Sequence, residues 1–258
     1  MITLTSDFGL KDPYVAEMKG AILSVNPNAT LIDVTHEIEK FNLRGAAFTL
    51  AQAAPYFPKG TVHLAIVDPG VGTERRAILV QTKQGYFVGP DNGILMLAAQ
   101  NQGTQHIYEL ANKKFWRKKV SETFHGRDIF APVAAHLDMG VKPEEFGKEI
   151  TDPFAPEFVE AKKTGDCLIG EVLHVDGFGN IITNIYQKQI SAKNQKITFK
   201  LPTVAVTVAF CKTYADAKRQ VPIALIGSHS FLELAVNKGS AAEKFGVKPG
   251  AKVEVTEV

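Results

Sequence analysis

Residues 62–67, with the sequence VHLAIV, form the run that most constrains the fold of this 258-residue chain. A continuous apolar run of this length, which ends abruptly at Asp68-Pro69-Gly70, is typical of a strand buried on both faces in the middle of a sheet. Such a strand needs other elements packed over both faces of its sheet. The run therefore favours a layered α/β arrangement around a central strand.

The first two thirds of the chain alternate strand-like runs with helix-like periods, which predicts a Rossmann-like, layered α/β domain over residues 1–155. The helices are expected to begin at polar capping residues, because a side-chain oxygen there satisfies a free backbone N–H. Asp12, Asn42 and Asp91 are the predicted caps, and a further helix is predicted over 127–139. The strands predicted in this domain are 1–5, 30–34, 62–67, 77–81 and 85–88.

The pattern changes from residue 151 onward. Residues 151–166, rich in proline, glycine and mixed charge, are predicted to be a linker, and residues 165–258 a smaller, mostly antiparallel, barrel-like β domain. Ser240 and Gly246 are expected to begin and end one short helix in this domain. The strands predicted in this domain are 167–175, 181–185, 196–201, 204–210, 223–226 and 252–255.

Composition excludes several classes of protein. Only two cysteines argue against a secreted fold held by disulfides. A net charge of +2 argues against a nucleic-acid-binding protein, and no apolar run is long enough to span a membrane. The N-terminal residues also lack the basic and apolar regions of a signal peptide. We therefore expect a cytoplasmic protein that binds a small molecule, with neither nucleic acid nor a membrane as its partner.

Two carboxylates are expected at the carboxyl edge of the first sheet, where open α/β sheets bind ligands. Asp7 follows the first strand and could accept hydrogen bonds from two ribose hydroxyls, although a simple capping role would explain it equally well. Asp68 follows the buried run and is succeeded by glycines that allow a ligand to approach closely. A surface ion pair in a turn is the alternative for Asp68.

A cation and a histidine complete this set of candidates. Arg75 can fold back over the loop that follows Asp68, although the adjacent Arg76 leaves open which guanidinium points inward. His125 lies just before the helix predicted over 127–139, and a neutral imidazole there could accept a proton at neutral pH. No phosphate-binding glycine loop, serine nucleophile elbow or HExxH metal motif is present in the sequence. Kinases, simple dehydrogenases and serine hydrolases therefore lose support, and no metal site is predicted.

The second domain offers weaker candidates in its turns. Asn180 ends a glycine-rich turn and could present both donor and acceptor to a base edge, whereas Ser228 and Glu233 follow another strand. Tyr214 could stack on a flat ring. Each of these residues could equally be explained by turn formation or core packing.

Seven sequence blocks are distinctive enough to compare with known families. They are TLTSDFG at 3–9, IDVTH at 32–36, VDPGVGTERR at 67–76, PDNG at 90–93, TFHGRDIFAP at 123–132, DGFGNIITN at 176–184 and GSHSFLELAVNKGSAAE at 227–243. Together these blocks resemble those of the S-adenosyl-L-methionine (SAM) hydroxide adenosyltransferases, also called SAM hydrolases, which are related to the fluorinases and chlorinases. The likeness covers nearly the whole chain in the same order.

The resemblance implies a reaction in which water or hydroxide attacks C5′ of SAM, so that adenosine and methionine are formed. It implies a catalytic set of Asp68, Arg75 and His125, with Asp7 holding the ribose. Asn180, Tyr214, Ser228, Glu233 and Val236 fall in blocks that contact adenosine and methionine. It further implies a homotrimer with sites at subunit interfaces, and no metal or cofactor.

Two alternatives stay open at this point. A halide-dependent, chlorinase-like transferase would use the same substrate, but PDNG leads straight into a predicted helix and leaves no room for the extra loop of fluorinases. A protein that binds adenosine or SAM with little turnover would keep the same pocket.

Overall fold

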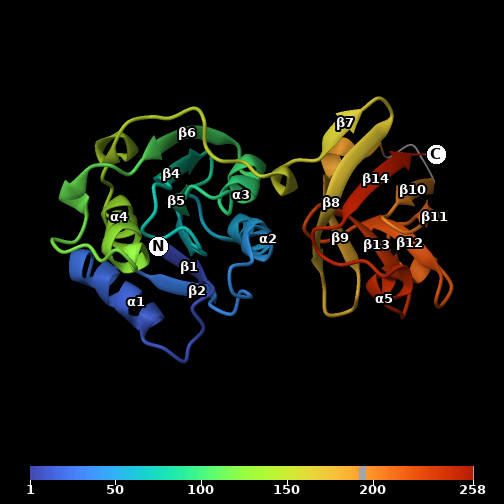
Figure 1. Cartoon of the computed structure of the whole chain (residues 1–258), viewed down its shortest axis with the longest axis horizontal. Coiled ribbons are helices and arrows are strands. Elements are labelled where there is room, and N and C mark those ends of the chain that lie inside the picture. Colours follow the sequence, from blue (N-terminus) through green and yellow to red (C-terminus); the bar gives the residue numbers. More distant parts are fainter. Residues whose placement is uncertain (192–195, 258) are drawn as a thin grey trace. The chain divides into compact units, whose positions relative to one another are not determined.

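The chain folds into two compact units, Met1–Pro156 and Glu157–Val258, in a computed structural model that describes residues 1–191 and 196–257 (Figure 1). The predicted linker contains the 3₁₀ helix η5 (Glu157–Val159) and the short strand β7 (Lys162–Thr164). Both elements belong to the second unit. The second unit therefore begins at Glu157, whereas its predicted start was residue 165.

The first unit is built on a six-stranded mixed sheet with the order β2-β1-β3-β5-β4-β6. Neighbours from β2 to β5 run parallel, whereas β4 is antiparallel to both β5 and β6. As the apolar run predicted, β3 lies inside the sheet and is buried along its whole length. The strands are β1 (Ile2–Ser6), β2 (Leu31–Thr35), β3 (Val62–Ile66), β4 (Ala77–Thr82), β5 (Tyr86–Pro90) and β6 (Thr104–Glu109).

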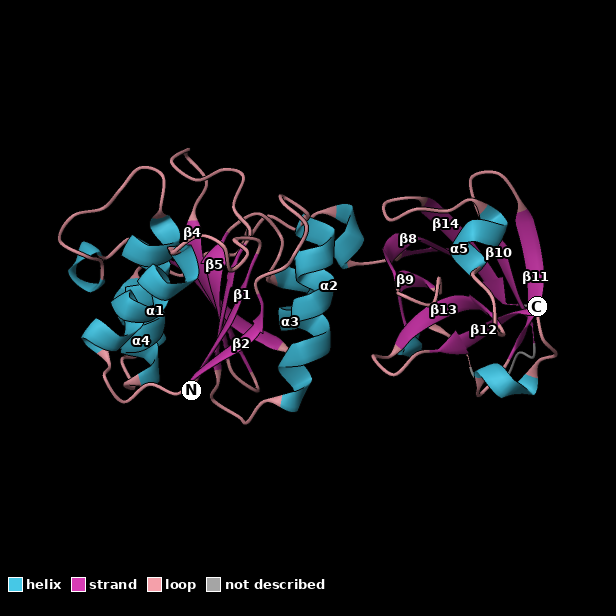
Figure 2. Ribbon diagram, turned by 90° about the horizontal axis from the view of Figure 1, so that it is seen from below, coloured by secondary structure: helices cyan, strands magenta, loops and turns pink. Residues whose placement is uncertain are grey.

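Helices cover both faces of this sheet, which confirms the layered α/β prediction (Figure 2). On one face α1 (Tyr14–Val25) packs beside α4 (Ala131–Asp138), and on the other α2 (Leu43–Ala53) packs beside α3 (Met96–Asn101). A π-helical turn, η3 (Gly126–Phe130), leads directly into α4. The short 3₁₀ helices of this unit are η1 (Ala54–Tyr56), η2 (Lys113–Phe115) and η4 (Pro143–Phe146).

Only one of the three predicted caps in this unit is a cap. The Asn42 side chain accepts a hydrogen bond from the Gly45 backbone N–H at 2.8 Å, as expected. Asp12 is not the N-cap of α1, because Pro13 occupies that position. Asp91 is not a cap either, because its carboxylate accepts hydrogen bonds from Arg76 and from the backbone of a distant loop.

The second unit is a closed barrel, which confirms the prediction of a mostly antiparallel, barrel-like β domain. Seven strands follow the order β14-β10-β11-β12-β13-β9-β8, and pairing of β14 with β8 closes the ring. All neighbours are antiparallel except β11 and β12. The strands are β8 (Cys167–Val175), β9 (Ile181–Tyr186), β10 (Lys196–Lys200), β11 (Ala205–Phe210), β12 (Pro222–Ile226), β13 (Phe231–Val236) and β14 (Lys252–Glu257).

Strand β13 was not among the predicted strands, although it is buried along its whole length between β12 and β9. The short helix α5 (Ala241–Phe245) follows it as predicted, with the Ser240 hydroxyl accepting from the Glu243 N–H and Gly246 ending the helix at φ 63°. Two 3₁₀ turns, η6 (Gln187–Gln189) and η7 (Tyr214–Asp216), complete the unit.

His63 is a buried titratable group in the centre of the first sheet. Its Nδ1 lies 2.8 Å from the Thr3 hydroxyl, and its ring stacks on Phe87 with centroids 4.9 Å apart. Burial lowers the pKa of His63 to about 4, because the charged imidazolium loses its hydration there. His63 is therefore neutral in the folded protein at neutral pH.

This burial predicts a pH dependence of stability. The lowered pKa means that, below pH ~6.5, the unfolded chain binds a proton at His63 that the folded chain does not. The free energy of unfolding should therefore fall as the pH drops from ~6.5 to about 4, by up to about 3 kcal/mol from this residue. Chemical denaturation of His63→Gln across this range should show a smaller loss than the unsubstituted protein. Equal slopes for the two proteins would contradict the prediction.

Candidate functional site

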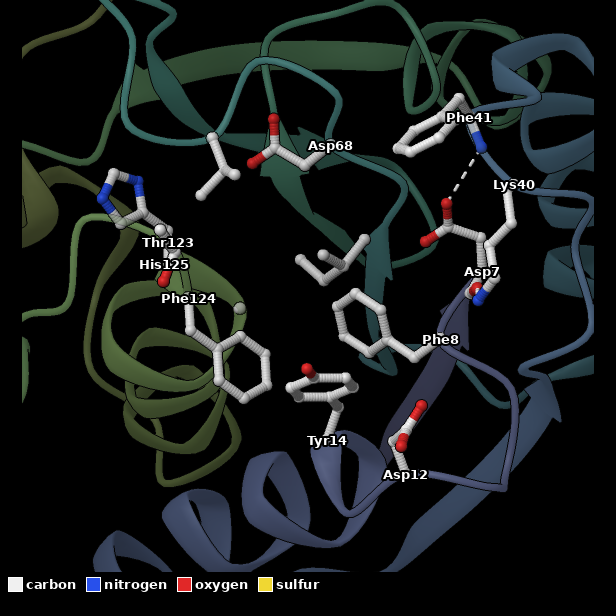
Figure 3. A pocket seen from close by; sticks show the side chains of 13 residues that line it. Asp7, Phe8, Asp12, Tyr14, Lys40, Phe41, Asp68, Thr123, Phe124 and His125 are labelled. Atoms are coloured by element: carbon white, nitrogen blue, oxygen red, sulfur yellow. Dashed lines mark hydrogen bonds between the residues drawn. The ribbon is translucent and has the colours of Figure 1, made fainter.

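The parallel pairing of β1 with β3 brings Asp7 and Asp68 to the same edge of the sheet. Ser6 lies opposite Ile66 in the register, so the chain segments that leave both strands emerge side by side. Both carboxylates line a cavity of about 380 Å³ (Figure 3). The sequence-based expectation of two carboxylates at this edge is therefore met in the structure.

Asp7 is buried and fixes the loop that follows β2. Its Oδ2 accepts a hydrogen bond from the Phe41 backbone N–H at 3.0 Å, and its backbone carbonyl accepts from the Lys40 ammonium. Phe41 itself has the left-handed φ of 64°, which is uncommon for an aromatic residue. Figure 3 shows the other carboxylate oxygen of Asp7 directed into the cavity, where it is available to a ligand.

Arg75, Asp68 and His125 form one hydrogen-bonded cluster. Arg75 Nε lies 3.0 Å from both carboxylate oxygens of Asp68, and Arg75 Nη2 lies 2.5 Å from Asp68 Oδ2. The same Nη2 lies 2.9 Å from His125 Nδ1. The side chains of Arg75 and Asp68 are only 11% and 6% exposed, so their charges interact with little screening by water.

Arg76 points away from this cluster. Its guanidinium donates to Asp91 Oδ2 at 2.8 Å, and to both the side chain and the backbone of Asp152. The structure therefore selects Arg75 as the inward-pointing guanidinium, which the sequence left open.

His125 sits immediately before the π-helical turn η3, and Asp128 holds the loop in front of it. The fully buried Asp128 carboxylate accepts from the Ser121 backbone N–H and from the Arg127 guanidinium, while its backbone carbonyl accepts from the Arg117 N–H. Burial lowers the pKa of His125, and the positive charge of Arg75 lowers it further. The imidazole is therefore neutral at physiological pH.

An aromatic wall completes the cavity, and sequence reasoning missed it. The rings of Phe8, Tyr14 and Phe124 contact one another with centroids 5.3–5.8 Å apart, and Figure 3 shows them grouped opposite Asp68. Tyr14, the first residue of α1, is 46% exposed and lines the cavity. Asp12, expected to be a cap, lines it as well.

The second unit has a cavity of its own, of about 550 Å³. Three predicted site residues, Asn180, Tyr214 and Val236, line it. Asp176 and the 82%-exposed Phe178 also line it, and both lie in the glycine-rich turn that drew attention to Asn180. Asp176 Oδ2 accepts a hydrogen bond from the Asn180 side-chain amide at 2.9 Å, which fixes the direction of that amide.

Glu233 holds Tyr214, which lines this second cavity, in position. The Tyr214 hydroxyl donates to Glu233 Oε2 at 2.9 Å, and Glu233 is 6% exposed on β13. Burial raises the pKa of Glu233, and the nearby Asp176 carboxylate raises it further. Ser228 is exposed, with its hydroxyl 3.2 Å from His229 Nδ1, and it is not among the residues described as lining the cavity.

Two negative findings concern the described part of the chain. Within residues 1–191 and 196–257, no three His, Cys, Asp or Glu side chains are grouped closely enough to hold a metal ion. Over the same residues, no helix combines the length and apolar character that crossing a membrane requires.

Gly72 marks the point where the turn after Asp68 meets the loop that carries His125. It has a φ of 77°, and a Cβ atom built on it would lie 2.5 Å from the Glu122 backbone oxygen. Only glycine allows this approach. The relative position of Asp68 and His125 therefore depends on a backbone contact as well as on Arg75.

Two family models match the chain. The model of the SAM hydroxide adenosyltransferase N-terminal domain matches residues 2–147, and the model of the C-terminal domain matches residues 170–254. Among curated proteins, an (R)-S-adenosyl-L-methionine hydrolase of Thermus thermophilus is 38% identical, with 97% of each chain covered. A fluorinase of an Actinoplanes species is more distant, at 29% identity over 100% of this chain and 97% of the fluorinase.

A solved structure has the same fold. The crystal structure of an uncharacterized conserved protein from Thermotoga maritima aligns with a TM-score of 0.85 and 40% sequence identity, and the alignment covers 100% of both chains. The fold of this chain is therefore shared with an experimentally determined relative.

The contact at Gly72 predicts a substitution that damages both stability and activity. Gly72→Ala should destabilise the protein by more than the ~1–2 kcal/mol that a left-handed alanine costs, because its methyl group must displace the Glu122 carbonyl. Thermal unfolding and turnover measurements would test this, with Gly60→Ala as the matched control. Gly60 also has a positive φ, of 88°, but has nothing within 4 Å of its built Cβ. Equal melting temperatures for the two variants would show that the contact is unimportant.

Proposed function

The chain belongs to the SAM hydroxide adenosyltransferase family, and we propose that it hydrolyses SAM to adenosine and L-methionine. The observation that carries this proposal is the hydrogen-bonded cluster of Asp68, Arg75 and His125 at the edge of an acidic cavity. This cluster offers both donors and acceptors to one water molecule. It corresponds in sequence order to the set that the family resemblance implied.

The charge of the cavity suits a cationic ligand. Asp7, Asp12 and Asp68 all line it, whereas the nearby cations are Lys40, which also lines it, and Arg75, which pairs with Asp68. An excess of carboxylates in a partly enclosed cavity attracts a cation such as a sulfonium. The aromatic wall of Phe8, Tyr14 and Phe124 adds ring faces that interact favourably with positive charge.

The proposed reaction is a direct displacement at C5′ of the ribose. A water held by the cluster attacks C5′ in line with the C5′–S bond, the new C–O bond forms, and the C–S electron pair leaves with sulfur. Methionine departs as a neutral thioether, so the leaving group needs no proton and the reaction needs neither a metal nor an added cofactor. Catalysis then depends on orientation and on a nucleophile with little competing solvation.

We assign the substrate-binding roles as follows. Asp7 accepts hydrogen bonds from the ribose hydroxyls through the carboxylate oxygen that faces the cavity. The residues of the second unit contact the adenosine and methionine portions, with Tyr214 held in position by Glu233. The second-unit residues in this assignment are Asn180, Tyr214, Ser228, Glu233 and Val236.

We further propose a homotrimer in which the first unit of one chain and the second unit of its neighbour supply the two halves of each site. Support comes from the separate chemistry of the two cavities. The first cavity carries carboxylates and the water-binding cluster, whereas the second carries an amide and an aromatic ring suited to a nucleobase.

A cytoplasmic location fits this activity. Cys167 and Cys211 are both free thiols, which a reducing compartment maintains. Nucleic acid and membranes are not expected partners for a chain with a net charge of only +2.

A product assay in heavy-oxygen water tests the proposed reaction. Incubation with SAM in H₂¹⁸O should give adenosine whose 5′-oxygen carries the label, detected by mass spectrometry, and added chloride should not change the product. Asp68→Asn should lower kcat by about 10²–10⁴-fold, because the neutral amide cannot take up a proton and loses the ion pair with Arg75. Asp166→Asn, in an exposed turn, is the matched control and should keep full activity. Unlabelled adenosine, or none at all, would refute the proposal.

Mixed oligomers test the shared site. Asp68→Asn is defective in the first unit and Tyr214→Ala in the second, so each variant alone should form an oligomer of low activity. In randomly mixed trimers, a site shared between neighbours combines two intact halves in about one case in four, so activity should return to roughly a quarter of the unsubstituted level. Sites contained within a single chain would give no recovery on mixing. A monomer or dimer in sedimentation analysis would also contradict the trimer.

A further inference from the structure

The guanidinium of Arg75 is held on three sides. Its Nε and Nη2 donate to the Asp68 carboxylate, and Nη2 also lies 2.9 Å from His125 Nδ1. Its central carbon lies 5.2 Å from the ring centroid of the fully buried Phe130, so an aromatic face supports it from the third side. The N–H groups of Arg75 therefore point in fixed directions.

A guanidinium can only donate, because all of its nitrogens carry hydrogen and it stays protonated in proteins. The 2.9 Å contact with Arg75 therefore requires His125 Nδ1 to be the acceptor, and an accepting ring nitrogen carries no hydrogen. The neutral ring must then carry its hydrogen on Nε2. In this tautomer the only basic lone pair of the imidazole is already occupied by Arg75.

From this geometry, and on the basis of the function proposed above, we infer that His125 is not the base of the reaction. It is a positioning residue for Arg75, present as the neutral Nε2–H tautomer, and the proton of the attacking water goes to Asp68. As the C5′–O bond forms and the C5′–S pair leaves with sulfur, one O–H bond of the water breaks and its proton bonds to a carboxylate oxygen. Asp68 then releases this proton to solvent.

The net effect of burial and of the charged groups around His125 favours the neutral form of its ring. Burial and Arg75 both lower its pKa, while Asp68, Glu122 and Asp128 raise it without reversing the direction. Protonation at Nδ1 would replace the hydrogen bond with a repulsive contact between two cations 2.9 Å apart. The sequence suggested that this imidazole could accept a proton, whereas we infer that the hydrogen bond from Arg75 occupies the nitrogen that would accept it.

The tautomer can be measured without any turnover. In protein labelled with ¹⁵N-histidine, the His125 signals can be assigned by comparison with the His125→Asn variant. Between pH 6 and 8 they should show an unprotonated Nδ1 and a protonated Nε2. In Arg75→Leu the constraint is removed, so the two tautomers should both be populated. A protonated Nδ1 in the unsubstituted protein would overturn the inference.

Two substitutions separate a positioning role from a basic one. The amide oxygen of His125→Asn can occupy the place of Nδ1 and accept from Arg75, but it cannot bind a proton at neutral pH. His125→Gln extends beyond that place, and His125→Ala leaves it empty. We expect kcat within about tenfold of normal for Asn, and losses of about 10²-fold or more for Gln and Ala. If His125 were the base, Asn would be as inactive as Ala.

Further readouts guard against misfolding and against failure of the proposed function. The kcat of the unsubstituted enzyme should decline at acidic pH as His125 is protonated, and this component should be missing from the profile of His125→Asn. Unchanged melting temperatures would show that the variants fold. If the unsubstituted protein released no adenosine, the proposed function would fail while the tautomer measurement still decided the state of His125.

Discussion

The site depends on one guanidinium that joins three segments distant in the sequence. Arg75 precedes β4, Asp68 follows β3, and His125 precedes η3, and the hydrogen bonds of Arg75 hold all three together. A charge-assisted pair with two parallel hydrogen bonds is both strong and directional. In the proposed reaction, a water bound here meets groups that are already oriented, so little reorganisation is needed.

The sheet supplies the rigid frame for this interaction. Because β1 and β3 are parallel neighbours in register, Asp7 and Asp68 leave the sheet at one edge. The Asn92 side-chain amide donates to the Val67 carbonyl at 2.8 Å and so fixes the start of the turn that carries Asp68. On the opposite wall, the buried Asp128 holds the loop before His125. Loops that must position side chains are therefore tied to the core at several points.

Most of the fold could be predicted from hydrophobic periodicity and turn residues. The buried run of β3 indicated the layered sheet, and the strand predicted over 167–175 coincides with β8. Strand β13 escaped prediction because its apolar residues surround Glu233 without strict alternation. The Tyr214 hydroxyl donates to the buried Glu233 and so offsets part of the cost of its burial, and that partner is distant in the sequence.

The sequence by itself determined that Asp7 and Asp68 follow strands and that His125 lies just before a helix, and hence which of these side chains are candidates for the proposed site. Only the tertiary structure decided how they are arranged. It selected Arg75 over Arg76, because Arg76 pairs with carboxylates elsewhere. It brought the ring of Tyr14 into the cavity and placed a permanent donor against Nδ1 of His125. The strand-end positions follow from local patterns, whereas tautomers and ion pairs depend on neighbours that only folding brings together.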